Sequence, residues 1–367
     1  MNEVPGTMLS LLLTEPGKRE LRRVPVPKPG PNEVLCRIQA VAICGSDPKI
    51  IRGDTAGKWP PSYPFIAGHE WAGEVVAVGE NVFGFECGDR VAGEAHAGCG
   101  FCARCLSGYY NLCENYGKPE TGHRHYGHLS NGAYAQYNVF MPRSLTKMPD
   151  NVSFAEGALV DPAGTALHCL QLTGITPGGT VVVIGPGPIG LIAMRMSRIF
   201  GAGKVIVVGR GGRLASAMRL GADVGIDFTK MDSVAAIHAA TNGMGADEVF
   251  ECSGAEGTLD EAIRMVRRGG KIGLIGIPPA EIREKVPFAE IVLDEKTIYG
   301  SRANPNVSAM VLDLIGSGQL VVRDLITHRF PLAEFEKGFE VFLTRIDGAL
   351  KVIVEPNGAS DNCARGY

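Results

Sequence analysis

The first third of the chain carries short apolar and β-branched runs separated by turn residues. The runs cover residues 33–42, 74–78 and 90–92, with Pro, Gly, Asn and Asp between them. Runs of this length bounded by turn residues are typical of strands. We therefore expect residues 8 to about 95 to form an all-β, barrel-like unit.

After Pro162 the pattern changes to alternating strands and helices. The sequence predicts strands at 180–184, 204–208, 248–251 and 271–275, and helices at 163–173, 188–200, 213–220 and 258–267. This alternation predicts an α/β domain with a doubly wound parallel sheet. Beyond it we expect helices at 306–316 and 332–344, a strand at 350–354 and a mobile tail at 356–367.

The composition agrees with a globular protein of two domains. The 367 residues are 45% hydrophobic and 20% charged, with a net charge of -3. No basic run is present to follow a nucleic acid backbone or an anionic membrane. The apolar run at 8–13 lacks the basic flank of a signal peptide, and Gly and Pro interrupt the stretch around 181–195. We expect a cytoplasmic protein without nucleic acid or membrane partners.

Four cysteines lie close together in a C-x2-C-x2-C-x7-C pattern: Cys99, Cys102, Cys105 and Cys113. The two-residue gaps allow consecutive thiolates to converge on one tetrahedral zinc ion. A closed four-thiolate site leaves no open position, so this zinc would be structural. A disulfide framework would require an oxidising compartment. Five further cysteines lack pair-like spacing and are expected to be reduced: Cys36, Cys87, Cys169, Cys252 and Cys363.

A glycine-rich turn follows the predicted strand at 180–184 and opens the next helix. It has the G-x-G-x-x-G pattern, with glycines at 185, 187 and 190 around Pro188 and Ile189. The glycines permit a tight turn, close approach of a pyrophosphate, and close helix packing, while the helix N-terminus attracts the anion. In this context the motif predicts a dinucleotide site made of Gly185, Gly187, Pro188, Ile189 and Gly190.

The turn after the predicted strand at 204–208 indicates whether the cofactor is NADP or NAD. A cofactor without a 2′-phosphate usually meets an Asp or Glu there. This chain has Gly209 and Arg210, followed by Arg213. Two guanidinium groups can hold a 2′-phosphate, which favours NADP over NAD. The alternative is that both arginines are solvated surface residues.

Two shorter motifs lie upstream, Cys44-Gly-Ser46-Asp47 and Gly68-His69-Glu70. Alone, such a cysteine is more often a buried thiol, and such a histidine more often a hydrogen-bonded one, than a metal ligand. Together with the four-cysteine lobe and the glycine turn, they make the chain resemble the zinc-dependent medium-chain dehydrogenase/reductase family over essentially its full length. The resemblance implies a GroES-like catalytic domain of residues 1–160 and 301–355, with the lobe at about 95–115, and a Rossmann domain of residues 161–300.

The resemblance also implies a second zinc ion, which would be catalytic. Cys44, His69 and Glu70 would hold it, with Asp161 as a further ligand or one water away. Three such ligands leave an open position at which zinc can lower the pKa of a substrate hydroxyl. Ser46 would accept the alcohol proton, unless its hydroxyl only caps the following segment. Glu70 and Asp161-Pro162 are similar to the polyol, sugar and threonine dehydrogenase branches.

Some residues depart from the family pattern or have open roles. Lys49 stands where several threonine-like members carry a relay histidine. His96 would lie beside the substrate, or would be an exposed histidine that anchors the lobe. Arg302 would face the cofactor phosphates and the substrate, or would be a surface residue. Three further histidines match no metal motif and could line the substrate site or lie in an exposed loop: His123, His125 and His128.

We therefore expect an enzyme that transfers hydride between a small polar secondary alcohol and a nicotinamide, with two zinc ions per chain. It would be a homo-oligomer, a tetramer rather than a dimer. The alternatives are a catalytically silent or regulatory homologue, and an L-threonine 3-dehydrogenase that uses NAD. A zinc-free quinone or enone reductase would lack Cys44, His69 and Glu70.

Overall fold

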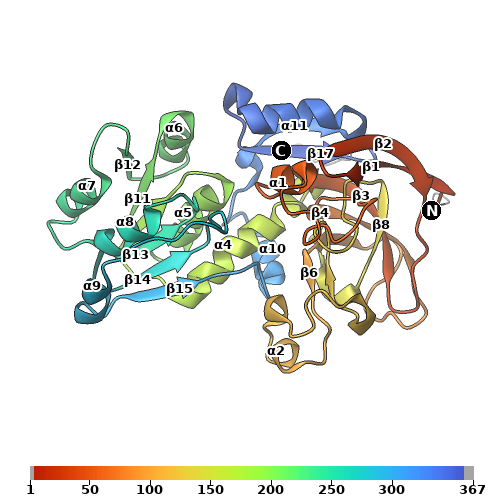
Figure 1. Ribbon diagram of the computed structural model, residues 1–367, viewed down its shortest axis with the longest axis horizontal. Helices are drawn as coiled ribbons and strands as arrows, with labels where there is room; N and C mark the ends of the chain where they lie inside the picture. Colours follow the sequence, from red (N-terminus) through yellow and green to blue (C-terminus); the bar gives the residue numbers. More distant parts are fainter. Residues whose placement is uncertain (1–3, 359–367) are drawn as a thin grey trace. The chain divides into compact units, whose positions relative to one another are not determined.

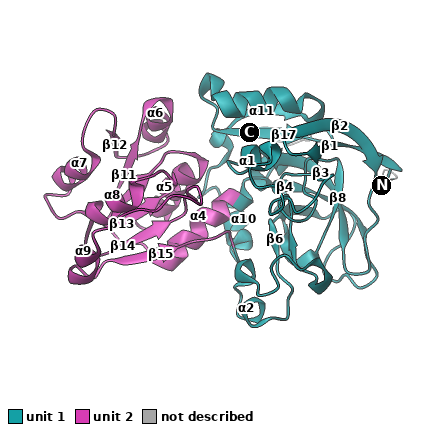
Figure 2. Cartoon of the chain, viewed as in Figure 1, with its two compact units in different colours: residues 1–161, 305–367 teal, residues 162–304 magenta. Residues whose placement is uncertain are grey.

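The computed structural model describes residues 4–358 and divides into two compact units (Figure 2). One consists of residues 1–161 and 305–367, and the other of residues 162–304. Residues 359–367 of the expected mobile tail, including Cys363, lie outside the described residues. No helix within 4–358 is both long and apolar enough to cross a membrane.

The first unit is built on antiparallel strands (Figure 1). Its largest sheet runs β16-β17-β3-β4-β5-β9, with β8 also paired to β3. Smaller sheets are formed by β1 with β2 and by β6 with β7. The strands are β1 (Thr7–Glu15), β2 (Lys18–Pro25), β3 (Val34–Ala42), β4 (Glu70–Val78), β5 (Arg90–Gly93), β6 (His96–Ala97), β7 (Arg124–His125), β8 (Tyr137–Phe140), β9 (Leu145–Lys147), β16 (Ile326–Pro331) and β17 (Lys351–Glu355).

Strand β3 runs through the core of this unit. It is buried along almost its whole length, which explains its continuous apolar sequence. Trp71 from β4 stacks on Phe140 from β8, with ring centroids 4.0 Å apart. Short helices connect and cover the strands: α1 (Asp47–Arg52), α2 (Ala103–Leu106), α3 (Phe154–Gly157), α10 (Ser308–Gly316) and α11 (Phe335–Thr344). The expected helix at 332–344 is shorter because a 3₁₀ turn occupies Leu332–Glu334.

The second unit confirms the predicted parallel, doubly wound sheet. Its strands run in the order β12-β11-β10-β13-β14-β15, and every neighbouring pair is parallel. Ligands of such sheets bind where the strand order reverses, here outside the carboxyl end of β10. The strands are β10 (Thr180–Ile184), β11 (Lys204–Gly209), β12 (Val224–Asp227), β13 (Ala246–Glu251), β14 (Val266–Leu274) and β15 (Thr297–Gly300).

Helices pack along this sheet (Figure 1). They are α4 (Val160–Thr173), α5 (Pro188–Ile199), α6 (Gly211–Arg219), α7 (Ser233–Ala240), α8 (Thr258–Met265) and α9 (Phe288–Leu293). Because both faces of the central strand are covered, residues 181–184 of β10 are all buried.

Candidate active site

Three potential metal ligands meet where β3 ends and β4 begins. Ala42 pairs with Glu70 across these antiparallel strands, which brings the segment after β3 beside the start of β4. One ligand atom from each of Cys44, His69 and Glu70 lies within 4.8 Å of the others. His69 and Glu70 are buried and Cys44 is half-buried. A thiolate, an imidazole and a carboxylate are three of the four ligands that a catalytic zinc ion needs.

The first residue of α1 positions two of these groups. One carboxylate oxygen of Asp47 accepts hydrogen bonds from the Cys44 N–H at 2.8 Å and from the Tyr134 hydroxyl at 2.6 Å. The other oxygen lies 3.9 Å from Nδ1 of His69. Asp47 is fully buried. Asp47 therefore holds the backbone of Cys44 by a hydrogen bond and places an anion beside His69.

Strand β17 supplies the cation of the site. Nζ of Lys351 forms an ion pair with the Glu70 carboxylate and lies 3.4 Å from the Ile43 carbonyl. Both side chains of the pair are less than 5% exposed. Burial opposes the charge on Lys351, but Glu70 and Cys44 raise the pKa of its ammonium group.

The charges around these ligands fit a divalent cation. Burial opposes a charged imidazole, yet Cys44, Asp47 and Asp161 raise the pKa of His69 to about 10. Burial, with a contribution from Glu70, raises the pKa of Asp161 to about 6 despite the attraction of His69. The raised pKa of His69 shows that the surrounding anions attract positive charge to this set. Zinc would supply such a charge.

Asp161 lies close enough to His69 to raise the pKa of the imidazole, and His96 follows Ala95 along the chain. The Asp161 carboxylate accepts a hydrogen bond from the Ala95 N–H at 3.3 Å, but it is not among the three converging ligand groups. His96 is in β6 and only 3% exposed. The alternative of an exposed histidine that anchors the lobe is therefore wrong.

Ser46 and Lys49 differ in their surroundings. Ser46 stands at the N-cap of α1, but its side chain makes no capping hydrogen bond, so the alternative of a capping role is wrong. Its hydroxyl oxygen is buried and, among the described residues, has no hydrogen-bond partner. Lys49 is exposed on α1.

The histidines of the segment 117–132 are buried. The alternative that placed them in solvent is wrong, because the structure buries all three: His123 at 2%, His125 at 5% and His128 at 7% exposure. The ring of His128 packs on the ligand His69, with centroids 4.6 Å apart.

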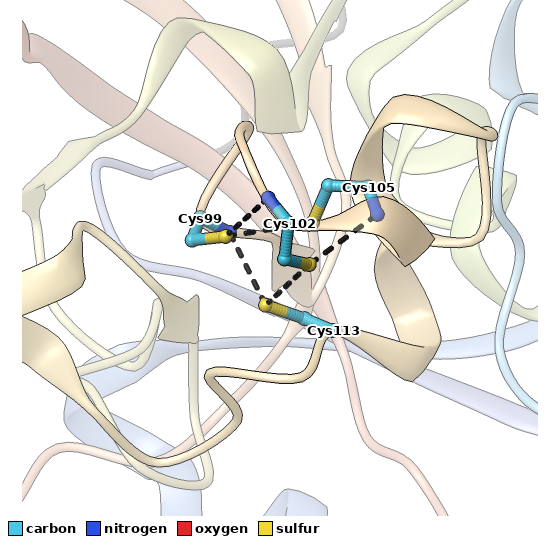
Figure 3. Close-up of side chains that lie close together, drawn as sticks. All are labelled: Cys99, Cys102, Cys105 and Cys113. Carbon is cyan, nitrogen blue, oxygen red and sulfur yellow. Dashed lines mark hydrogen bonds between the residues drawn. The ribbon is translucent and has the colours of Figure 1, made fainter.

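The four cysteines of the lobe converge as their spacing predicts (Figure 3). Sγ of Cys99 lies 3.9 Å from Sγ of Cys105, and Cys102 and Cys113 are separated by the same distance. Tetrahedral zinc–sulfur bonds of about 2.3 Å place thiolates about 3.8 Å apart, so the set fits a zinc ion. Burial disfavours the Cys99 thiolate, but hydrogen bonds from Asn115 and the Cys102 N–H help lower its pKa to about 6.

The glycine turn occupies the end of β10 and the start of α5. Gly185 has a φ of +94°, and a Cβ added there would meet Ser253. A Cβ at Gly190 would collide with the carbonyl of Gly185, so helix and turn pack closely. Gly187 is the N-cap of α5, and Pro188 begins the helix ahead of Ile189. These features place free backbone amides of a helix N-terminus at the reversal point of the sheet.

The arginines predicted to select the cofactor lie beside this turn. The Arg210 guanidinium stands over the Phe228 ring, 5.6 Å from its centroid. Arg213 reaches back to the turn, because a Cβ on Gly187 would be 3.8 Å from its guanidinium. Gly209 has a steric reason for lacking a side chain, since a Cβ there would overlap the Pro186 ring. Arg302 is half-buried just after β15.

Sequence reasoning missed three residues that support the site. Asp47 was part of a quoted motif, but nothing in its spacing revealed its contact with His69. Lys351 did leave a signal, because it is a lone charge inside an otherwise apolar predicted strand. Phe228 left none, since an aromatic residue after a short strand is most often part of the core.

The two sites lie on different units of one chain, and together they define the class of a zinc-binding dehydrogenase. The family model for the alcohol dehydrogenase GroES-like domain matches residues 30–150, and that for zinc-binding dehydrogenases matches residues 188–317. The chain belongs to the zinc-dependent medium-chain dehydrogenase/reductase family, and it is an enzyme of the alcohol dehydrogenase type.

Similar proteins include enzymes with different substrates. A sorbitol dehydrogenase of Bacillus subtilis is 35% identical over 96% of this chain and 99% of its own length. An L-threonine 3-dehydrogenase of Bacillus licheniformis is 34% identical over 95% of this chain and 99% of its own.

Solved structures with the same fold carry different nicotinamides. A putative zinc-binding dehydrogenase of Sinorhizobium meliloti, bound to NADP, has a TM-score of 0.87 and 29% identity over 96% of this chain and 100% of its own. A short chain alcohol dehydrogenase from Escherichia coli CFT073, complexed with NADH, has a TM-score of 0.86 and 27% identity over 96% and 100% of the two chains.

Proposed function

We propose that the protein oxidises a secondary alcohol of a small polyhydroxylated or amino-alcohol substrate at a zinc ion held by Cys44, His69 and Glu70. The observation that carries the proposal is the convergence of these three donors, two buried and one half-buried, beside the anions that raise the pKa of His69. A closed structural site would need a fourth protein ligand, as the four-cysteine lobe has. Asp161 lies near enough to act on the ion directly or through one water.

The chain's own residues have separate tasks in this reaction. Bound zinc would polarise the substrate hydroxyl and the nicotinamide would accept the hydride. Asp47 places a negative charge 3.9 Å from Nδ1 of His69, and Lys351 pairs with the Glu70 carboxylate. The buried hydroxyl of Ser46 accepts the alcohol proton and passes it outward, and the exposed Lys49 provides a possible exit toward solvent. In this proposal His96 would lie beside the substrate.

Zinc content and turnover together test the metal assignment. Cys44→Ala and His69→Ala should reduce the zinc content from two ions per chain to one and abolish turnover, because the lobe retains its own ion. Cys87→Ala, which changes an exposed thiol outside both sets, should retain two ions and full activity. Either active-site variant with full activity would refute the assignment.

NADP is the favoured cofactor because two guanidinium groups flank the glycine turn. Arg210, held over Phe228, would contact the 2′-phosphate, and Arg213 would contact phosphate nearer Gly187. Losing one charge-assisted contact costs about 1.5–3 kcal/mol, or roughly ten- to a hundredfold in kcat/KM.

Single alanine variants separate this role from a surface role. Arg210→Ala should lower kcat/KM with NADP and leave NAD unaffected, whereas Arg219→Ala on the exposed end of α6 should change neither. A wild-type preference for NAD, or a preference that ignores both arginines at the turn, would show that NADP is not the physiological partner.

A catalytically silent homologue is the competing function, and its expected signature is one zinc ion with no turnover on any alcohol. We further propose a cytoplasmic homo-oligomer, with a tetramer favoured over a dimer. Free thiols at Cys36, Cys87, Cys169 and Cys252 support a reducing compartment. Mass measurement in solution, for example by light scattering, would test the assembly.

A further inference from the structure

Glu251 is the last residue of β13, beside the reversal point of the parallel sheet. It pairs with Ile184 at the end of β10 on one side and with Leu274 at the end of β14 on the other. Glu251 is only 3% exposed. A buried carboxylate therefore adjoins the segments that follow all three strands.

The carboxylate holds the segment that follows β13. Oε1 accepts hydrogen bonds from the Ser253 N–H at 2.8 Å, from the Gly254 N–H at 3.0 Å and from the Ser253 hydroxyl. Oε2 lies 3.1 Å from the same Gly254 nitrogen. The Ser253 hydroxyl in turn accepts a hydrogen bond from the Ala255 N–H at 3.2 Å. Glu251 thus fixes the backbone of three successive residues, directly or through Ser253.

The main chain of Glu251 holds the segment that follows β14. Its carbonyl accepts hydrogen bonds from the Ile275 N–H at 2.8 Å and from the Gly276 N–H at 3.0 Å. A Cβ on Gly276 would lie 2.1 Å from the Gly254 nitrogen and 2.5 Å from Oε2 of Glu251, so no side chain fits there. The two segments therefore meet beside Glu251 in direct backbone contact.

The segment after β13 also lies against the glycine turn. A Cβ on Gly185 would be 2.9 Å from Cβ of Ser253 and 3.1 Å from its nitrogen. The Cys252 N–H donates to the Ile184 carbonyl at 2.9 Å, which fixes the approach of the two segments. Glu251 therefore determines where Ser253 stands beside the turn that would receive the pyrophosphate.

The order of the strands indicates which half of a dinucleotide these segments would meet. In a sheet of this kind the two mononucleotide halves lie on opposite sides of the reversal point. The turn after β11, with Gly209 and Arg210, is on the adenosine side, and β13 and β14 are on the other side of β10. Ser253 and Ile277, on the two segments that Glu251 joins, are exposed and available to the nicotinamide half.

We propose that Glu251 is a positioning residue for the cofactor, and that it joins the segments after β13 and β14 into the surface that receives the nicotinamide half of the dinucleotide. This inference rests on the proposed function. Without the carboxylate, the Ser253 and Gly254 amides lose their acceptor, and the segment after β13 spends part of its time away from the binding arrangement. The apparent affinity then falls with the fraction of the protein that is competent to bind.

Cofactor fragments test this role in the full-length, zinc-loaded protein by calorimetry, without turnover. Glu251→Met nearly keeps the size of the side chain but removes both acceptor oxygens. We expect the Kd of NADP and the Kd of NAD each to rise about tenfold, as they would if the competent fraction fell to about one tenth. The adenosine fragments 2′,5′-ADP and 5′-AMP lack the nicotinamide half, so their Kd should change by less than about twofold.

Glu248 provides a matched control nearer the amino end of the same strand. It is 1% exposed and accepts hydrogen bonds from the Thr176 N–H at 3.0 Å and from the Thr176 hydroxyl at 2.6 Å. Glu248→Met should lower the melting temperature and leave the Kd of all four ligands unchanged. Glu251→Gln keeps one oxygen for the Ser253 and Gly254 amides, so it should recover most of the affinity lost in Glu251→Met.

The fragment results separate a positioning role from a general loss of structure. Wild-type Kd values for NADP and NAD in Glu251→Met would overturn the proposal, and so would an equal rise for the adenosine fragments. If Glu251→Met does not fold, Ser253→Ala decides, because losing one bond to the carboxylate should raise the Kd of both dinucleotides about threefold and leave the fragments unaffected. Unchanged dinucleotide binding in Ser253→Ala would then overturn it. A wild-type protein that binds neither NADP nor NAD would instead refute the proposed function itself.

Discussion

Ser46 carries a buried hydroxyl for which the described residues provide no partner, beside the proposed metal ligands. A buried hydroxyl without a hydrogen bond is costly to the folded state, so its presence suggests a task in catalysis. Ser46→Ala should lower kcat by about a hundredfold or more, and it should keep or raise the melting temperature because it removes the unpartnered hydroxyl.

Ser144 is a matched control, because its loss should affect stability and not kcat. It is buried, but its hydroxyl donates to the Met141 carbonyl at 2.8 Å. Ser144→Ala should therefore cost about 1 kcal/mol of stability and leave kcat unchanged. Wild-type kcat in Ser46→Ala would show that this hydroxyl is not the proton acceptor.

Lys351 should matter most when zinc is absent. Lys351→Met leaves the Glu70 carboxylate buried without its cation, and breaking a buried pair typically costs about 3–5 kcal/mol. Bound zinc would supply a replacement positive charge for Glu70. Urea unfolding should therefore show that Lys351→Met lowers the free energy of unfolding more with a chelator than with zinc. Lys337→Met, which breaks an exposed pair with Glu334, should cost less than about 1 kcal/mol in both conditions. Equal losses with and without metal would contradict this account.

Among the elements, we expect the cysteine lobe to depend most on a bound ion. Helix α2 has four residues, too few to be stable alone, and its N-cap is the ligand Cys102. Cys102→Ser should release one zinc ion and lower the melting temperature, while the Cys44 set keeps its ion. Zinc analysis and thermal unfolding measure both effects. Two retained ions with unchanged stability would refute a structural zinc.

Glu94 joins three elements and gives the fold a pH dependence. It follows β5 and accepts hydrogen bonds from Tyr110 at 2.6 Å and from Ser308 of α10 at 2.5 Å. Burial outweighs these bonds and raises its pKa from 4.5 to about 7. The folded state thus binds the proton more tightly than the unfolded chain, and this contribution to stability is complete below about pH 4.5 and lost as the pH rises through about 7.

Glu94→Gln tests that dependence. The amide cannot ionise, so the urea midpoint of the variant should fall less between pH 5 and pH 8 than that of the wild type. Asp150→Asn, at an exposed carboxylate, should leave the wild-type slope unchanged. Parallel pH profiles for wild type and Glu94→Gln would contradict the assignment.

Helices and strands with a strong hydrophobic pattern could be predicted from the sequence. Short elements with a weak pattern could not. The run at 180–184 matches β10, because a continuous β-branched run has few other solutions. Strand β12 and helix α9 were missed, since β12 is a short segment with little apolar content and α9 is a helix of six residues. Strand β14 begins at Val266 rather than 271, where pairing with Ala246 extends it through arginines and glycines.

At the scale of the whole molecule, the convergence of the candidate metal ligands was predictable because their spacing is local or familiar. The stacking of the His96, His125 and His128 rings was not, because His96 and His125 meet only through the pairing of β6 with β7. His128 reaches His69 only through the close turn at Gly127. Such contacts depend on register and turn geometry, which single-residue patterns do not encode.

The pairing of Lys351 with Glu70 has a consequence for biosynthesis. The metal-binding unit is discontinuous, and its last strand, β17, is made only after all of residues 162–304. As the nascent chain leaves the ribosome, Cys44, His69 and Glu70 emerge early, but the cation that pairs with Glu70 emerges only after all of residues 162–304. Until then a metal ion is the available counter-charge, so zinc supply during synthesis should influence how much of the protein reaches its native state.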